Sequence, residues 1–355
     1  MIKLRNNYKY ALVVPSSMGV RLLPPNRQTV FSSNEFYMHA SSAETNTASV
    51  CSYLGLPVKV LTKFVKDSPV AAFIKANLRS RNMEYEGKEV EQGGPWGFRH
   101  QFNIADSGFG NRGPRVHNDR AGEVGKTLNI KDFDTEKLFS VDGVGILHLS
   151  GLICALSPET GEFCLELARL AKKEGTIVSF DFNYRASFWE NRESELRKIF
   201  TQIAQLSDII FANETDYRLC LGIDFPSADD IPPQEKFTRT VQRVKEFLPD
   251  VTVFATTLRD VKHANRHFFG AVSIDENNLQ YIEPREIAVL DRIGGGDAFV
   301  GGVLYGIIKG FSHDKQLQFG WASGVLASTF LTDYPQPTDE EQIWNIWNGN
   351  ARVIR

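Results

Sequence analysis

Short apolar segments alternate with amphipathic ones along most of the 355-residue chain, and this alternation constrains its fold more than any other feature. The apolar segments predict strands over 10–14, 58–64, 144–149, 176–181, 208–212 and 251–256. Helical spacing predicts helices over 43–53, 193–206, 237–247 and 313–329, with others that begin at Pro69, Pro158 and Thr338. Strands that alternate with helices pair in parallel, because each helix carries the chain back along the sheet. We therefore predict an α/β fold with a parallel sheet and helices on both of its faces.

Two stretches, 16–37 and 87–120, break this rhythm. Both are rich in Gly, Pro, Arg and Asn and show no helical period. The second contains Trp96, Phe98 and Phe109, more aromatic surface than a solvated loop carries. We predict that the two stretches form a small β-structured lid over the mouth of the main sheet; a disordered insertion is the alternative.

The predicted domains follow from these two breaks. The α/β core comprises 10–15, 38–86 and 121–345, the lid comprises 16–37 and 87–120, and a C-terminal tail comprises 346–355.

Charge and composition exclude several kinds of partner. Forty Lys and Arg residues oppose 43 Asp and Glu residues, a net charge of −3 that does not suit a nucleic-acid backbone. The chain has no apolar run of about 20 residues and no signal-peptide pattern, so we expect no membrane span and a cytoplasmic location. The four cysteines form no CxxC pair, which predicts reduced thiols and no structural metal site.

One glycine motif resembles a dinucleotide-binding motif but lacks its structural context. Gly108-Phe-Gly110-Asn-Arg-Gly113 matches GxGxxG, but Pro114 and a polar run follow it instead of a helix. A dinucleotide site needs a strand before this motif and a helix after it. We predict a loop here.

A second glycine motif, Gly294-Gly295-Gly296-Asp297, is better placed, because a strand-like segment precedes it and a helix begins at Ala298. Three glycines let successive backbone N–H groups point at one spot, and the helix dipole adds positive potential there. The turn therefore suits a phosphoryl group, and Asp297 could accept the proton of an attacking hydroxyl. A plain glycine-rich turn with Asp297 as helix cap is the alternative.

Polar residues also follow two neighbouring strands. Asp181, Asn183 and Arg185 lie at the end of one, and Asn213 and Asp216 at the end of the next. Open α/β sheets bind their ligands at this edge. Each residue could instead be a capping or loop residue, but together they predict a site.

The segment DRIGGGDAFVGGVLYGI resembles the C-terminal signature of the PfkB/ribokinase family of carbohydrate kinases. Within that family the likeness is closest to the 2-keto-3-deoxygluconate kinases, because of DRIGGGDAF and FDFNYRASFW. The resemblance runs from about residue 10 to residue 345. It implies a ribokinase-like three-layer α/β/α sandwich with a mostly parallel central sheet and a small β lid.

The resemblance also implies a role for each matching residue. Asp297 would be the catalytic base, with the N–H groups of Gly294, Gly295 and Gly296 stabilising the transferring phosphoryl group. The residues implied for the substrate are Ser42, Asn46, Arg99, Phe102, Arg115, Asn183 and Arg185. Those implied for the nucleotide are Asn213, Asp216, Thr257, Gly270, Gly294 and Gly296. Asp216 would also help to place Mg²⁺ through water. ATP and Mg²⁺ are thus the implied cofactors, and a monovalent cation is left open.

Four departures from the family pattern stand out. Ser41-Ser42 replace the two glycines of the sugar motif, and Ser16-Ser17 end the first strand where the family usually has a polar or acidic residue. Asp216 is one methylene shorter than the usual Glu. Thr257-Leu-Arg259 lacks the glycine expected beside the nucleotide. The first departure bears on the substrate and the last on nucleotide affinity.

We therefore predict an ATP-dependent kinase that phosphorylates a primary hydroxyl of a small keto-sugar acid, 2-keto-3-deoxygluconate. A kinase for a neutral sugar such as fructose, or for a nucleoside, is one alternative. A non-catalytic sugar-binding regulator on a kinase scaffold is another. The family likeness and the aromatic residues of the lid also predict a homodimer that forms through the two lids.

Overall fold

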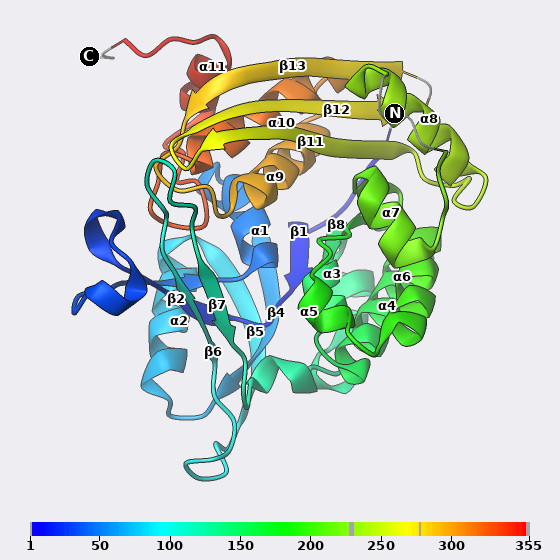
Figure 1. The fold of residues 1–355 in the computed structure, drawn as a ribbon. Helices are drawn as coiled ribbons and strands as arrows, with labels where there is room; N and C mark the ends of the chain where they lie inside the picture. Colours follow the sequence, from blue (N-terminus) through cyan, green and yellow to red (C-terminus); the bar gives the residue numbers. More distant parts are fainter. Residues whose placement is uncertain (1, 227–230, 277, 353–355) are drawn as a thin grey trace.

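In the computed structural model, which describes residues 2–226, 231–276 and 278–352, nine strands form one large sheet (Figure 1). Their order is β13-β12-β11-β10-β9-β8-β1-β4-β5. The bounds are β1 (Tyr10–Pro15), β4 (Val58–Val65), β5 (Met83–Val90), β8 (Val144–Ser150), β9 (Ile177–Asp181), β10 (Ile209–Phe211), β11 (Val253–His263), β12 (Arg266–Asp275) and β13 (Asn278–Ala288). From β5 to β11 all neighbours pair in parallel, and β12 and β13 add an antiparallel edge. The predicted mostly parallel sheet is confirmed.

Helices cover both faces of this sheet, and each helical layer has its own apolar core. One layer contains α1 (Ala43–Tyr53), α2 (Pro69–Ser80), α9 (Gly295–Ile308), α10 (His313–Ala327) and α11 (Glu340–Trp347). The other contains α3 (Gly151–Ala155), α4 (Pro158–Lys173), α5 (Ala186–Trp189), α6 (Glu193–Leu206), α7 (Glu214–Leu221) and α8 (Pro233–Lys245). The predicted three-layer α/β/α sandwich is therefore confirmed.

Capping residues explain where several helices begin. The side chains of Ser42, Ser68 and Ser157 each accept a hydrogen bond from a backbone N–H in the first turn of α1, α2 and α4. The last helix differs by one residue from the expectation, because Asp339 caps it in place of Thr338. The Asp339 side chain accepts from the N–H of Gln342, and the Gln342 side chain in turn accepts from the N–H of Thr338.

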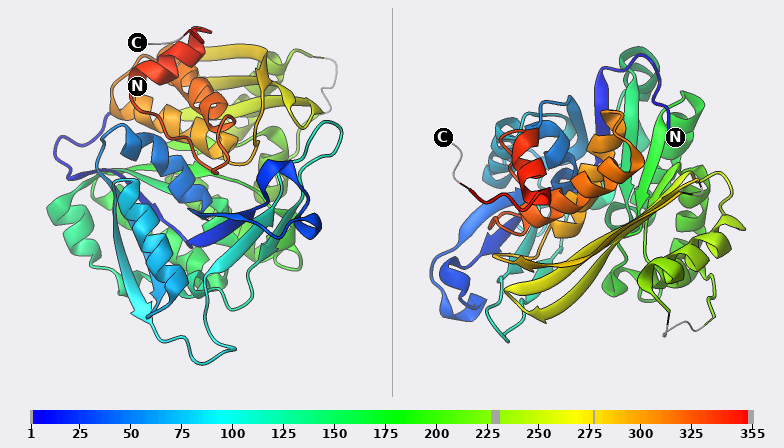
Figure 2. Two further views of the ribbon diagram at one scale, coloured as in Figure 1. Left: turned by 90° about the vertical axis from the view of Figure 1, so that its left-hand side faces the viewer. Right: turned by 90° about the horizontal axis from the view of Figure 1, so that it is seen from above.

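A separate four-stranded sheet forms the predicted β lid (Figures 1 and 2). Its order is β3-β2-β6-β7, with β2 and β6 parallel and the outer pairs antiparallel. The bounds are β2 (Gly19–Leu23), β3 (Tyr37–Ser41), β6 (Gln101–Ala105) and β7 (Val116–Asp119). Residues 38–41 thus belong to the lid sheet although the sequence places them in the core, whereas 87–90 end β5 of the large sheet.

The loop predicted at Gly108–Gly113 connects β6 to β7. Its Gly110 carbonyl accepts a hydrogen bond from the N–H of Ala264, 2.8 Å away in the turn between β11 and β12. The lid therefore contacts the antiparallel edge of the large sheet.

Three further expectations concern the chain as a whole. The four cysteines are buried and form no disulfide. Within the described ranges, no helix is long and apolar enough to cross a membrane. Of the predicted tail 346–355, the first two residues complete α11, and 353–355 lie outside the described residues.

Candidate active site

The glycine turn before α9 is the structural centre of the site. Gly294 caps the helix with φ +81°, and a Cβ there would clash with the backbone carbonyl of Asp333. Gly296 faces open space. Among the described residues, no acceptor meets the N–H groups of Gly296 and Asp297. The turn therefore offers two unpaired backbone donors at the positive end of a helix dipole, which suits an anion.

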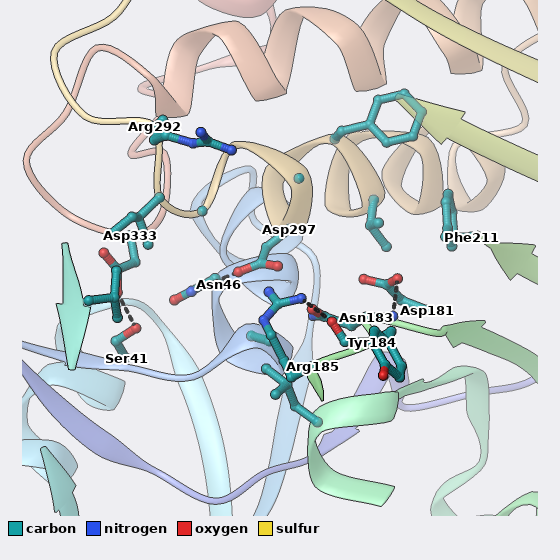
Figure 3. Close-up of a pocket in the computed structure, with 18 of the residues that line it drawn as sticks. Ser41, Asn46, Asp181, Asn183, Tyr184, Arg185, Phe211, Arg292, Asp297 and Asp333 are labelled. Atoms are coloured by element: carbon teal, nitrogen blue, oxygen red, sulfur yellow. Dashed lines mark hydrogen bonds between the residues drawn. The ribbon is translucent and has the colours of Figure 1, made fainter. Parts of the chain in front are cut away.

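A cavity of about 610 Å³ opens in front of this turn, at the carboxyl ends of the parallel strands (Figure 3). Several residues predicted from the sequence line it together: Asn46, Asn183, Arg185, Asn213, Asp216, Thr257, Gly294, Gly296 and Asp297. They come from segments far apart in the chain, which the parallel strands bring to one edge.

Asp297 lies in the first turn of α9, and one of its oxygens is already held. Asn46 Nδ2, from α1, donates a hydrogen bond to Asp297 Oδ2 at 2.9 Å (Figure 3). Burial raises the pKa of Asp297 to about 7, although the Asn46 hydrogen bond and the charge of Arg185 favour the ionised form. A carboxylate with this pKa can accept a proton near neutral pH.

Two further carboxyl groups lie near Asp297. Burial, and then the charges of Asp297 and Asp216, raise the pKa of Asp181 to about 8. Burial also raises the pKa of Asp216, which forms a reciprocal capping box with Asn213 at the start of α7. Because nearby positive charge does not balance these carboxylates, they favour the binding of a cation.

The donor set fits Mg²⁺. Magnesium prefers oxygen ligands and keeps several waters, so one or two carboxylates with substrate phosphates are its usual protein site. Asp181 and Asp216 supply such oxygens at the cavity wall. The described part of the chain contains no cluster of three or more His, Cys, Asp or Glu residues that could enclose a metal.

Arg185 brings positive charge to the cavity. Among the described residues, its guanidinium donates one hydrogen bond, to the carbonyl of Tyr184 at 2.9 Å. Its charge also lowers the pKa values of Asp181, Asp216 and Asp297 relative to burial alone. Most of its donors are therefore free for a carboxylate or phosphate.

Six predicted residues lie outside the cavity lining: Ser42, Arg99, Phe102, Arg115, Gly270 and Gly295. Ser42 is used as the cap of α1, and its hydroxyl also bonds Ser16 and Thr45. Arg99 pairs with Asp119 and donates to the Ala121 carbonyl.

The other four residues have different surroundings. Phe102 packs on the apolar core, and Arg115 is exposed. Gly270 lies on β12 where a Cβ would meet the Ile282 carbonyl at 2.6 Å, and Gly295 is buried in the turn.

The lid instead presents side chains that the sequence did not single out. Asn103 and Asn118, from β6 and β7, line the cavity with Arg120. Arg120 pairs with the buried Glu123 at 2.8 Å, so its charge is already balanced. Side chains alternate between the two faces of a strand, so Asn103 of β6 points to the face opposite Phe102. This alternation is the sequence signal that could have identified Asn103.

A second group of residues that the sequence analysis did not identify lies next to the glycine turn. Arg21, from lid strand β2, is buried and makes ion pairs with Asp291 and Asp333. Ser41 donates a hydrogen bond to Asp333 at 2.6 Å, and Ser107 donates to Asp291 at 2.7 Å. Lid and turn thus share one buried polar network.

Comparisons with known proteins agree with this architecture. A family model described as pfkB family carbohydrate kinase matches residues 24–339. The chain is similar to 5-dehydro-2-deoxygluconokinase of Clostridium perfringens, with 29% identity over 223 residues, 62% of this chain and 60% of that protein. It is also similar to 2-dehydro-3-deoxygalactonokinase of Haloferax volcanii, with 26% identity over 97% of this chain and 99% of that protein. The match therefore spans about 60% of the length of the Clostridium relative but nearly all of the Haloferax one.

A solved structure is similar over the whole fold. The crystal structure of 2-dehydro-3-deoxygluconokinase from Thermotoga maritima has a TM-score of 0.86 and 25% identity to this chain. The alignment covers 97% of this chain and 100% of that one.

Proposed function

The chain belongs to the pfkB family of carbohydrate kinases, and on that premise we propose that it transfers the γ-phosphoryl group of ATP to a primary hydroxyl of 2-keto-3-deoxygluconate. One observation carries the proposal. The side chain of Asp297, held by Asn46 through a 2.9 Å hydrogen bond, lines a 610 Å³ cavity together with the glycine turn, where the N–H groups of Gly296 and Asp297 meet no acceptor among the described residues. A proton acceptor and an anion site thus adjoin each other, as phosphoryl transfer to a hydroxyl requires.

The proposed reaction uses these groups in a single displacement. The substrate hydroxyl gives its proton to Asp297 as its oxygen forms a bond to the γ-phosphorus. The bond from that phosphorus to the bridging oxygen breaks, and ADP leaves with the electron pair. The N–H groups of Gly296 and Asp297 stabilise the charge on the transferring group. Asp181 and Asp216 are the side chains that would hold Mg²⁺ through water, and the ion would supply positive charge to the phosphates.

Two observations support a keto-sugar acid as the acceptor. The relatives described above are named for kinases of dehydro-deoxy sugar acids. Arg185 has free guanidinium donors at the cavity wall, and its planar fork suits the two oxygens of a carboxylate.

A kinase for a neutral sugar is the second candidate. Asn103 and Asn118 are carboxamides at the lid side of the cavity, and carboxamides bind hydroxyls without supplying charge. A neutral substrate has no charge to pair with the Arg185 guanidinium. Arg185 therefore favours a sugar acid as the substrate.

The test is ADP release from Mg²⁺-ATP across sugar acids, hexoses, pentoses and nucleosides. We expect turnover on 2-keto-3-deoxygluconate and its near relatives, and loss of that preference in Arg185→Ala. Turnover confined to neutral sugars would support the second candidate. Repeating the assay without K⁺ measures any dependence on a monovalent cation.

We propose further that the enzyme is a cytoplasmic homodimer. Four buried, unpaired cysteines are typical of a reducing compartment. The lid region exposes large apolar side chains, among them Phe31 at 92%, Trp96 at 98% and Phe109 at 62%. Such surface is commonly covered by a second copy of the chain. Sedimentation equilibrium should give the dimer mass, and the double variant Phe31→Ser, Trp96→Ser should give a monomer.

A further inference from the structure

Two arginines beside the glycine turn have no acidic partner in the part of the chain that the structure describes. Arg259 lies on β11, and Arg292 precedes Gly294 of the turn by two residues. Neither makes an ion pair with any residue in the described ranges, whereas Arg21 below the turn pairs with two aspartates. Arg259 also belongs to the segment Thr257-Leu-Arg259, which lacks the glycine that the family resemblance leads one to expect beside the nucleotide.

The Arg259 guanidinium is held in a defined place. It lies over the ring of Phe269, 4.5 Å from its centroid, and its Nη1 donates to His267 Nδ1 at 3.1 Å. Burial, and then the charges of Arg259 and Arg292, lower the pKa of His267 to about 4, so the ring is neutral and can accept this bond. On the other side, a Cβ at Gly295 would come within 3.0 Å of Arg259 Nη2. The arginine therefore reaches the glycine turn at Gly295, on the side away from the residues that line the cavity.

Arg292 approaches the same turn from the cavity side. Its side chain lines the cavity and makes no hydrogen bond to a described residue. Figure 3 shows its guanidinium extended above Asp297, on the opposite side from Arg185. The two arginines repel each other, and Arg292 contributes, after burial, to lowering the pKa of Arg259 to about 10.

Two cations near the positive end of a helix are unfavourable until an anion binds. An anion with several charges would relieve this repulsion and also meet the free N–H groups of Gly296 and Asp297. We propose that Arg259 and Arg292 bind the β- and γ-phosphates of the nucleotide from two sides of the glycine turn. The proposal rests on the proposed kinase function and names residues that set its affinity for triphosphates.

Calorimetric titration of the full chain with ATP, ADP and AMP tests this role. In Arg259→Gln and in Arg292→Gln we expect ATP to bind about tenfold more weakly or worse, since a charge-assisted hydrogen bond is lost. The affinity for AMP should stay within twofold, because its phosphate does not reach the turn. Arg259→Lys should recover part of the ATP affinity. Arg266→Gln is the matched control, since Arg266 lies on the neighbouring strand and pairs with Glu286 at the surface.

Two results would overturn the proposal. One is unchanged ATP affinity in both glutamine variants. The other is an equal loss for ATP and AMP, which would mean that the arginines act on the nucleoside or only on the fold. Because Arg292 is exposed, its variant should fold even if Arg259→Gln does not. The titrations contain no sugar, so a wrong acceptor substrate would not affect them.

Discussion

Asn46 Nδ2 donates a hydrogen bond to Asp297 Oδ2 at 2.9 Å, across a separation of 251 residues. The bond occupies one oxygen of the carboxylate and leaves the other for a substrate hydroxyl. Asn46 Oδ1 is buried and has no partner among the described residues. The observed hydrogen bond of Asn46 is therefore the one that orients Asp297.

The first prediction concerns pH. Because Asp297 must be ionised to act as base, kcat/KM should fall with decreasing pH through the Asp297 pKa of about 7. In Asn46→Ala the carboxylate loses a hydrogen bond that favours its ionised form, so the acid limb should move to higher pH. The same Mg²⁺-ATP is used for both proteins, which cancels titration of the nucleotide. An acid limb near pH 4, or a shift to lower pH in the variant, would contradict this role.

The second prediction compares two glycines of the turn. Gly294→Ala should destabilise the protein, because the new Cβ meets the Asp333 backbone and φ is +81°. Gly296→Ala should fold normally, since nothing lies within 4 Å of its Cβ, yet its methyl group would stand in the cavity. We expect a lowered Tm for the first variant and a raised KM for ATP for the second. Equal effects on both properties would argue against a phosphate-binding turn.

The third prediction concerns Mg²⁺. Asp181→Asn should raise the Mg²⁺ concentration for half-maximal ADP release about tenfold, because the cation loses a carboxylate near the phosphates. Glu235→Gln on the surface of α8 is a suitable control, since among the described residues Glu235 pairs with Arg239 alone. An unchanged Mg²⁺ requirement in Asp181→Asn would remove this aspartate from the metal site.

The fourth prediction concerns the buried network below the turn. Arg21→Met leaves Asp291 and Asp333 buried without their cation, which should cost about 3–5 kcal/mol in urea unfolding. Burial alone would raise the pKa of Asp333, but the charge of Arg21, the adjacent His39 and a hydrogen bond from Ser41 hold it well below its usual range.

The contribution of that low pKa is therefore present at neutral pH and is lost as the pH falls below about 4. The control Arg266→Met removes an exposed pair and should cost less than about 1 kcal/mol. A similar small loss in Arg21→Met would show that the network does not stabilise the fold.

The main sheet and the glycine turn could be predicted because their signals are local. Strand and helix periods, the caps Ser68 and Ser157, and the glycines at 294–296 each depend on a few adjacent residues. The antiparallel β12–β13 edge was not predicted, because its pairing depends on contacts between strands rather than on a pattern within one strand.

The lid side of the cavity was harder to predict for a related reason. A strand presents alternate residues to opposite faces, and its sequence does not say which face meets the core. Phe102 was predicted to contact substrate, but Asn103 lines the cavity. The neighbouring residues Ser41 and Ser42 likewise have different roles, since Ser42 caps α1 and Ser41 faces the cavity.

The pairing of Asn46 with Asp297 could be expected only from the family resemblance, because no local pattern joins residues so distant in the chain. The network of Arg21, Asp291 and Asp333 left no signal of its own, since a buried arginine looks like any other arginine in a sequence. Both pairings depend on the tertiary fold.

The most direct test of the account is ADP release from Mg²⁺-ATP and 2-keto-3-deoxygluconate by the wild-type enzyme and by Asp297→Asn. We expect the variant to lose about a thousandfold in kcat, since its amide cannot accept the proton. Its Tm and its affinity for ATP should stay close to those of the wild type. Turnover by Asp297→Asn within tenfold of the wild-type rate would contradict the assignment of Asp297 as the base.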